Sequence, residues 1–214
     1  MVVGPGLASA RQRRRWIIAF TLGELLGFGV LATAFGLLTL AMTRGLEARA
    51  RSLVQAAAAI AGGAVEGAVL ASFQWSVLRE RLPQSVRGAW LRNTAIAAAL
   101  AWAAGLAPPT LDELLDLGAA TQAVLWVAAA LVILPSIGVA QALALRGVEA
   151  RPRRWVLANV LGWLAGLPWT FVAPALLPDD SPAQAFWAAF LVGGTLMGAT
   201  AGWVTSRFLP APEA

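Results

Sequence analysis

The chain has 214 residues, of which 59% are hydrophobic and 13% are charged, and its formal net charge is +5. Ordinary soluble domains contain roughly half apolar and a quarter charged residues, so the composition excludes a typical soluble domain. The sequence also contains no Cys, His, Tyr or Lys. These absences exclude a disulfide, a thiol nucleophile, ordinary zinc or haem ligation and a lysine Schiff base.

The apolar residues lie in six blocks, each long enough to be a helix that crosses the hydrocarbon core. A crossing needs about 20 helical residues for a core of about 30 Å. The sequence therefore predicts an all-α polytopic membrane bundle with six transmembrane helices. The expected spans are 16–42, 53–78, 90–107, 121–145, 155–177 and 181–209.

Short polar segments are expected to flank and connect these spans. Residues 1–15 are predicted to be a basic tail, residues 16–210 the membrane domain and residues 211–214 a C-terminal tail. Pro108-Pro109 is expected to end the third span, and Thr110 with Glu113 forms the pattern of a capping box. A separate short helix over 110–117, lying in the membrane interface, is therefore expected.

The arginines predict the orientation of the bundle. The second and third predicted outer loops are purely acidic, and the first outer loop holds Arg44, Arg49 and Arg51. By the positive-inside rule both termini are expected in the cytoplasm, with the protein in the bacterial inner membrane. Anionic lipids are the expected partners of these arginines, and no face suits nucleic acid. The inner arginines are Arg11, Arg13, Arg14, Arg15, Arg79, Arg81, Arg87, Arg92, Arg146, Arg151, Arg153, Arg154 and Arg207.

Three similar hairpins are predicted, over 16–79, 90–146 and 155–207. Each begins at a tryptophan (Trp16, Trp90 or Trp155) that is expected to anchor the bundle in the membrane interface. Each ends at an arginine that could contact lipid headgroups or form an ion pair: Arg79, Arg146 and Arg207. Chance self-similarity in a chain rich in Ala, Gly, Leu and Trp is the alternative to a true triplication.

The ends of the first two hairpins share a short motif, which reads Gln74-Trp75-Ser76-Val77-Leu78-Arg79 in the first and Gln141-Ala142-Leu143-Ala144-Leu145-Arg146 in the second. The pattern resembles bacterial multi-span membrane proteins in which hairpins ending in Gln-Trp-x-x-Leu-Arg recur. This resemblance implies a repeated-hairpin fold and implies no activity.

Two carboxylates inside predicted spans are the foremost candidates for function, because polar groups at membrane depth cost free energy unless they are partnered. Glu66 lies about thirteen residues into the second span, near the midplane. It could bind a proton, a cation or a substrate amine, or it could be a protonated residue bonded to a neighbouring helix. Glu24 is expected in the inner half, with Arg79 or Arg146 as ion-pair partners.

Four amide side chains are expected near the inner level of the membrane: Gln74, Gln141, Asn93 and Asn159. They could line a polar pocket that opens to the cytoplasm. Interhelical hydrogen bonds between them are the alternative.

Three functions remain open on this sequence. The leading hypothesis is a non-catalytic structural or assembly subunit, in contact with other membrane subunits or with itself, which could hold a lipid or pigment between its helices. The second is a small-solute transporter, or the solute-binding subunit of one, that uses Glu66 and Glu24. A lipid-processing enzyme is third, because no catalytic residues, metal ligands or cofactor motif are evident.

Overall fold

The computed structural model describes residues 9–149, 151–178 and 180–209, and all regular structure in these residues is helical. The elements in chain order are α1 (Ala10–Glu24), the π-helix η1 (Leu25–Ala32), α2 (Thr33–Met42), α3 (Ala48–Leu78), the short 3₁₀-helix η2 (Gln84–Val86), α4 (Arg87–Leu115), α5 (Ala119–Ala144), α6 (Pro152–Gly166), α7 (Pro168–Ala175), α8 (Ala183–Thr205) and the 3₁₀-helix η3 (Ser206–Phe208).

The prediction of six membrane-spanning helices is confirmed for the described residues. Six helical segments are long and apolar enough to cross a membrane. The first of them, Ala10–Met42, joins α1, η1 and α2 into 33 consecutive helical residues. The fifth joins α6 and α7, which meet at Leu167 just before Pro168. Proline at this position leaves a backbone carbonyl without its usual donor, which explains the break.

The predicted end of the third span at Pro108-Pro109 is wrong. Helix α4 continues through both prolines to Leu115, so the separate interfacial helix over 110–117 does not form. Two adjacent prolines remove two intrahelical hydrogen bonds, but in a membrane bundle neighbouring helices can satisfy the backbone. Gln122 of α5 donates its Nε2–H to the Pro108 carbonyl at 3.2 Å, which ties α5 to this part of α4. Asp116, with a φ of 50°, ends the helix instead.

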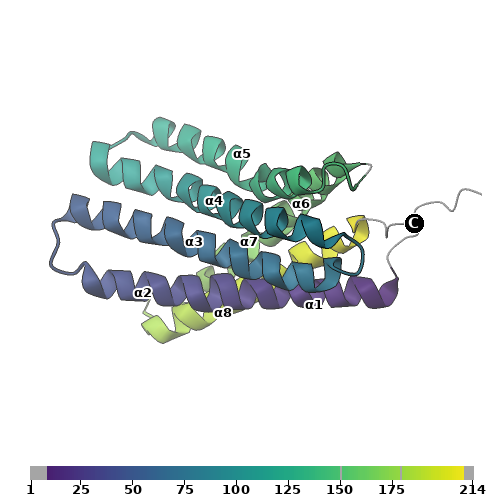
Figure 1. Ribbon diagram of the computed structural model, residues 1–214. Helices are drawn as coiled ribbons and strands as arrows, with labels where there is room; N and C mark the ends of the chain where they lie inside the picture. The colour runs from purple at the N-terminus through teal and green to yellow at the C-terminus, as the bar shows by residue number, and fades with distance from the viewer. Residues whose placement is uncertain (1–8, 150, 179, 210–214) are drawn as a thin grey trace, which may run out of the picture.

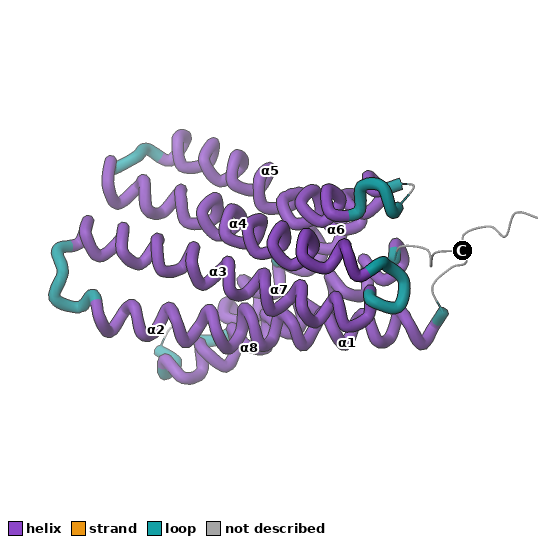
Figure 2. Tube along the Cα trace, viewed as in Figure 1, coloured by secondary structure: helices purple, strands orange, loops and turns teal. Residues whose placement is uncertain are grey.

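The helices form a closed ring in chain order. Helix α1 packs against α3, α3 against α4, α4 against α5, α5 against α6, α6 against α8, and α8 returns to α1. Figure 1 shows α1 to α5 side by side, with α6, α7 and α8 behind them. The two described ends of the chain lie at one end of the bundle, and the α2–α3, α4–α5 and α7–α8 connections lie at the opposite end (Figure 2). We call these the terminal end and the far end.

Glycines allow the close approaches that join one hairpin to the next. A Cβ on Gly67 of α3 would lie 2.6 Å from the Ala98 Cβ and 2.8 Å from the Thr94 oxygen of α4. A Cβ on Gly138 of α5 would lie 2.7 Å from the Asn159 Cβ of α6. Small residues at such crossings let backbones approach, which is how membrane helices gain packing energy where no hydrophobic effect drives them together.

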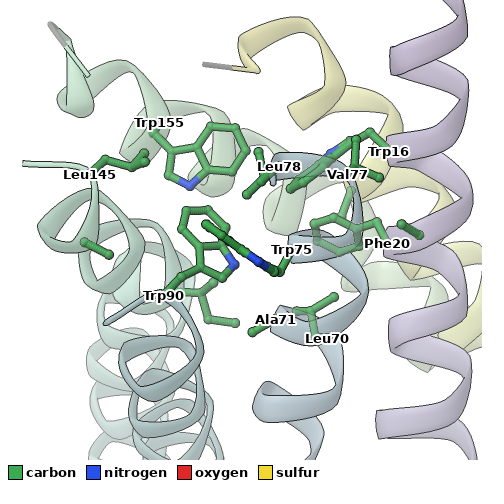
Figure 3. Close-up of a cluster of buried hydrophobic side chains, with 14 of the residues drawn as sticks. Trp16, Phe20, Leu70, Ala71, Trp75, Val77, Leu78, Trp90, Leu145 and Trp155 are labelled. Atoms are coloured by element: carbon green, nitrogen blue, oxygen red, sulfur yellow. The ribbon is translucent and has the colours of Figure 1, made fainter. Parts of the chain in front are cut away.

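The predicted role of Trp16, Trp90 and Trp155 as interfacial anchors is wrong. Their exposed fractions are 0%, 0% and 2%, so their side chains lie inside the bundle and do not face lipid. The Trp155 ring centroid lies 5.6 Å from that of Trp16 and 5.9 Å from that of Trp90. Figure 3 shows the three indoles among Leu78, Trp75 and their neighbours. These tryptophans form the hydrophobic centre of the terminal end.

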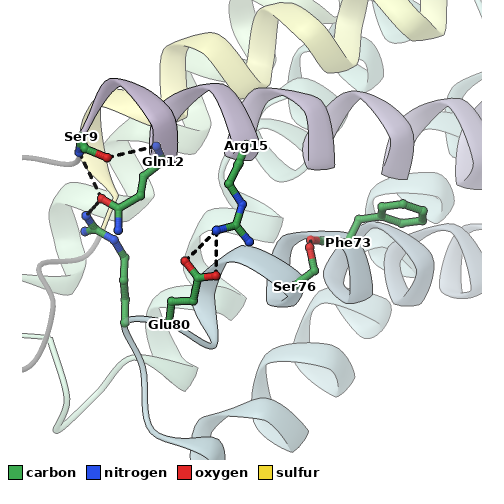
Figure 4. Close-up of polar contacts among 7 residues, drawn as sticks. Ser9, Gln12, Arg15, Phe73, Ser76 and Glu80 are labelled. Carbon is green, nitrogen blue, oxygen red and sulfur yellow. Dashed lines mark hydrogen bonds and ion pairs between the residues drawn. The ribbon is translucent and has the colours of Figure 1, made fainter.

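Polar contacts close the surface of the terminal end. Ser9 caps α1 through a reciprocal pair of hydrogen bonds with Gln12, so the helix begins within the predicted tail 1–15. Arg15 forms an ion pair with Glu80 at 2.7 Å, and Arg81 donates to the Gln12 Oε1 at 2.6 Å (Figure 4). Burial lowers the pKa of Arg81, and the neighbouring Glu80 opposes that shift. The predicted tail 211–214 lies outside the described residues.

Candidate functional site

The two predicted carboxylates lie close together between α1 and α3. Glu24 and Glu66 have exposed fractions of 0% and 8%. A Cβ on Gly27, one turn after Glu24, would lie 3.1 Å from the Glu66 Cγ, so the glycine makes room for Glu66 against the first helix. Glu24 is residue 15 of the 33 in its span. It therefore lies in the first half of the span, in agreement with the sequence.

Glu66 has a partner that the sequence analysis did not identify. Trp102 of α4 donates its Nε1–H to the Glu66 Oε2 at 2.6 Å. Gly63 permits this geometry, because a Cβ there would lie 2.1 Å from the Trp102 Cδ1. The bond matches the expectation that Glu66 is bonded to a neighbouring helix, and the ionisation state of Glu66 stays open. Spacing could have indicated the contact, since α3 and α4 are consecutive antiparallel helices.

Glu24 has no polar partner in the part of the chain that the structure describes. Both of its carboxylate oxygens are buried without a hydrogen bond. The predicted ion pair with Arg79 or Arg146 does not form among the described residues, since both arginines are exposed. Arg207 is also exposed and lies over the Trp203 ring, 3.5 Å from its centroid. Their contacts with lipid headgroups stay a prediction.

The first span changes its helical form directly after Glu24. Residues Leu25–Ala32 form a π-helix, and Glu24 is the residue before it. On the other side, a Cβ on Gly198 of α8 would lie 2.7 Å from the Glu24 Cβ. Segments of π-helix are rare and are frequently found at functional sites. The widened turns and the unpartnered carboxylate therefore coincide at one point of the bundle.

A cavity opens beside this pair and extends towards the far end; we call it the outer pocket. Its volume is about 370 Å³. Trp102 lines it and also donates to Glu66, whereas Glu66 and Glu24 are not among its lining residues. Its lining residues come from α2, α3, α4 and α8, and they are Thr33, Gly36, Thr39, Leu40, Ser52, Gln55, Ala56, Ala59, Gly62, Trp102, Leu106, Pro109, Thr110, Glu113, Trp187 and Phe190.

The four amide side chains were candidates to line a polar pocket open to the cytoplasm. This interpretation is wrong for three of them. Gln74, Gln141 and Asn159 are each 0% exposed. Gln141 donates to the Gln74 Oε1 at 2.8 Å and to the Thr94 Oγ1 at 3.1 Å, and it accepts from the Trp155 Nε1 at 2.9 Å. The alternative of interhelical hydrogen bonds is confirmed for these glutamines. We call Gln74, Thr94, Gln141 and Trp155 the amide cluster.

Asn159 and Asn93 lie beside this cluster in different ways. Asn159 donates to the Trp155 carbonyl in its own helix at 2.9 Å. Asn93 donates to the Ala140 carbonyl at 3.1 Å and lines a groove between α4 and α5. The groove has a volume of about 430 Å³, and its other lining residues include Ile96, Leu100 and Val139. Asn93 therefore faces a largely apolar surface and does not contribute to the carboxylate pair.

Comparisons of the chain with protein-family models, with curated proteins and with solved structures give no match.

Proposed function

We propose that this protein binds a small solute in the outer pocket and acts as a transporter, or as the membrane-embedded binding subunit of one. The observation that carries the proposal is a cavity of about 370 Å³ whose lining residue Trp102 donates a hydrogen bond to the buried Glu66. Solute sites are concave, mostly apolar and provided with a few convergent polar groups, and they have volumes of about 300–1,000 Å³.

The carboxylate pair supports a binding role over a purely structural one. A structural or assembly subunit needs packing faces, and the glycines and tryptophans of the terminal end already provide them. Glu24 adds no hydrogen bond to that packing, and Glu66 adds the one that it accepts from Trp102. Ionisable residues inside membranes are costly and generally belong to substrate or ion pathways. The protein is proposed to be non-catalytic, as the sequence indicated.

The orientation predicted from the arginines gives the proposal a direction. With both termini in the cytoplasm of a bacterium, the far end faces the outside, and the outer pocket receives its solute from that side. Glu66 and Glu24 then lie beyond the floor of the pocket, towards the cytoplasm. The amide cluster and the three buried tryptophans close the path below them in this conformation.

A thermal-shift screen of the purified protein tests the proposal. A solute that binds the folded state raises the unfolding temperature, because binding adds RT ln(1 + [L]/Kd) to stability. We expect at least one hit among small cationic, neutral and anionic solutes, and we expect Glu66→Gln to weaken it. Glu47→Gln, in the exposed α2–α3 connection, is the matched control. A screen without hits, or equal shifts in Glu66→Gln and the wild type, would contradict the proposal.

A second role, binding of a membrane lipid, is favoured by the α4–α5 groove. Its lining by Ile96, Leu100, Val132 and Leu143 suits an acyl chain. Native mass spectrometry should show a retained lipid that Ala97→Trp, inside the groove, displaces. Retention of the same lipid in that variant would argue against this groove.

A further inference from the structure

We infer that the solute of the outer pocket is a small organic ammonium cation, held by aromatic faces and by acceptor oxygens. The inference rests on the proposed function and names its substrate class. It is carried by three properties of the pocket: its charge, its hydrogen-bonding groups and its aromatic rings.

The charge of the pocket is negative. Among the sixteen lining residues that the structure describes, none is basic and one, Glu113, is acidic. The carboxyl group of Glu66 lies at the edge of the Trp102 ring, where it accepts the Nε1–H. A carboxylate or phosphate solute would find no Arg at this site, although Arg is the usual residue for recognising such groups. The pocket therefore favours a positive solute.

Two polar side chains of the pocket, Thr39 and Gln55, already donate hydrogen bonds to the protein itself. The Thr39 hydroxyl donates to the Phe35 carbonyl at 2.8 Å. Gln55 donates its Nε2–H to the Thr43 Oγ1 at 3.0 Å, which leaves the Gln55 Oε1 as an acceptor. A hydroxyl oxygen keeps its lone pairs when its proton is donated. These side chains therefore offer acceptors to a solute that carries N–H groups or a polarised N–CH₃ group.

Aromatic rings form another part of the pocket wall. Trp102, Trp187 and Phe190 line the pocket, and Phe28 lies behind them. The Phe28 centroid lies 4.8 Å from that of Phe190 and 6.1 Å from that of Trp102, and the rings of Trp187 and Phe190 meet edge to face. Faces of Trp and Phe attract cations, and aromatic cages are a recurrent means of binding quaternary ammonium groups.

The hydrogen bond from Trp102 to Glu66 strengthens this wall. An indole that donates its N–H to a carboxylate becomes richer in electrons, so its face attracts a cation more strongly. The same bond fixes the ring at the floor of the pocket. A bare metal ion fits less well, because hard cations require about six to eight oxygen ligands. An organic cation satisfies both the rings and the acceptors.

Isothermal titration of the detergent-solubilised full chain with choline tests the inference. The matched probe is 3,3-dimethylbutan-1-ol, a neutral molecule of nearly the same shape. We expect choline to bind at least about tenfold more tightly than this alcohol, which corresponds to one or two cation–π contacts. Tetramethylammonium should compete with choline for the same site.

Variants locate the binding on the chain. Trp187→Leu should weaken choline binding about tenfold, and Trp187→Phe should weaken it less. Because Trp187→Phe keeps a ring, it tests the wall even where the leucine variant fails to fold. Trp126→Leu, exposed on α5 and outside the pocket, is the control and should bind like the wild type.

The outcomes separate the inference from the proposed function. Equal affinity for choline and the alcohol, or selective binding of an anionic or neutral solute, overturns the ammonium inference and leaves the pocket as a solute site. Equal loss of choline binding in Trp126→Leu and Trp187→Leu also overturns it, because the wall would then have no special part. Failure of every probe class to bind overturns the inference and the proposed function together.

Discussion

The terminal end and the far end of the bundle differ in how tightly their helices pack. In α3 the buried residues run from Gly62 to Leu78, and its first turns contribute none. In the first span, α1 buries Trp16, Ala19, Phe20, Gly23 and Glu24, whereas in α2 Thr39 is the buried residue. The buried tryptophans and the amide cluster lie at the terminal end, whereas the outer pocket lies towards the far end.

This difference separates the part that holds the fold from the part that can bind. Membrane helices associate through close packing and interhelical hydrogen bonds. The terminal end has both, so it can fix the ring without help from the far end. The far end is then free to keep a cavity, and the carboxylate pair lies where the two parts meet.

The largest expected effect comes from filling the closest helix crossing. Gly67→Leu forces a side chain against the Thr94 carbonyl and Ala98, and we expect it to destabilise the protein by about 3 kcal/mol or to prevent folding. Unfolding in mixed micelles with increasing SDS measures the loss. The matched variant is Gly36→Leu, at a glycine of the outer pocket with no atom within 4 Å of its added Cβ.

Gly36→Leu should leave the stability unchanged within about 1 kcal/mol and lower solute binding. Equal destabilisation by both variants would show that the two ends pack alike.

Removing the central member of the amide cluster should have an intermediate effect. Gln141→Leu leaves the Trp155 Nε1–H and the Gln74 Oε1 without their partner, and we expect a loss of about 1–2 kcal/mol. The control is Gln122→Leu at the far end, which removes the bond to Pro108 and should cost under about 1 kcal/mol. The same SDS titration measures both variants. A larger loss of stability in Gln122→Leu than in Gln141→Leu would show that hydrogen bonding holds the far end more strongly than the terminal end.

The smallest effect should come from the ion pair at the surface of the terminal end. Glu80→Gln removes the ion pair with Arg15. The side chains of Arg15 and Glu80 are 39% and 41% exposed. Exposed pairs contribute about 0–1 kcal/mol and are screened by salt. We expect a shift of under about 1 kcal/mol that disappears in about 1 M NaCl. A loss that persists in high salt would indicate a buried, structural role for Glu80.

The sequence predicts the six spans because length and hydropathy suffice to recognise a crossing helix. It does not predict that Trp16, Trp90 and Trp155 turn inward, because a tryptophan at a span end suits both an interfacial belt and a buried crossing. The same holds for Pro108 and Pro109, which end helices in water but lie inside α4 here, because a membrane bundle can offer the backbone other partners. Local sequence carries no signal for such a partner.

Of the candidate site, the sequence identifies the two carboxylates and not their arrangement. Glu24 and Glu66 are recognisable because charge is rare at membrane depth. Their proximity depends on the register between α1 and α3, which Gly27 and Gly23 set by letting Glu66 and Leu70 approach. The Trp102 bond and the outer pocket depend on how four helices diverge. No spacing within one helix contains that information.

Accessibility of single cysteines tests the central claim most directly, because the native chain contains no cysteine. Ser52→Cys places a thiol in the outer pocket, and Ser85→Cys places one in the exposed α3–α4 connection at the terminal end. In intact cells, a membrane-impermeant maleimide should label Ser52→Cys and not Ser85→Cys, and the solute that binds the pocket should slow the labelling. Labelling of Ser85→Cys alone, or labelling of Ser52→Cys that a bound solute leaves unchanged, would contradict a solute pocket open to the outside.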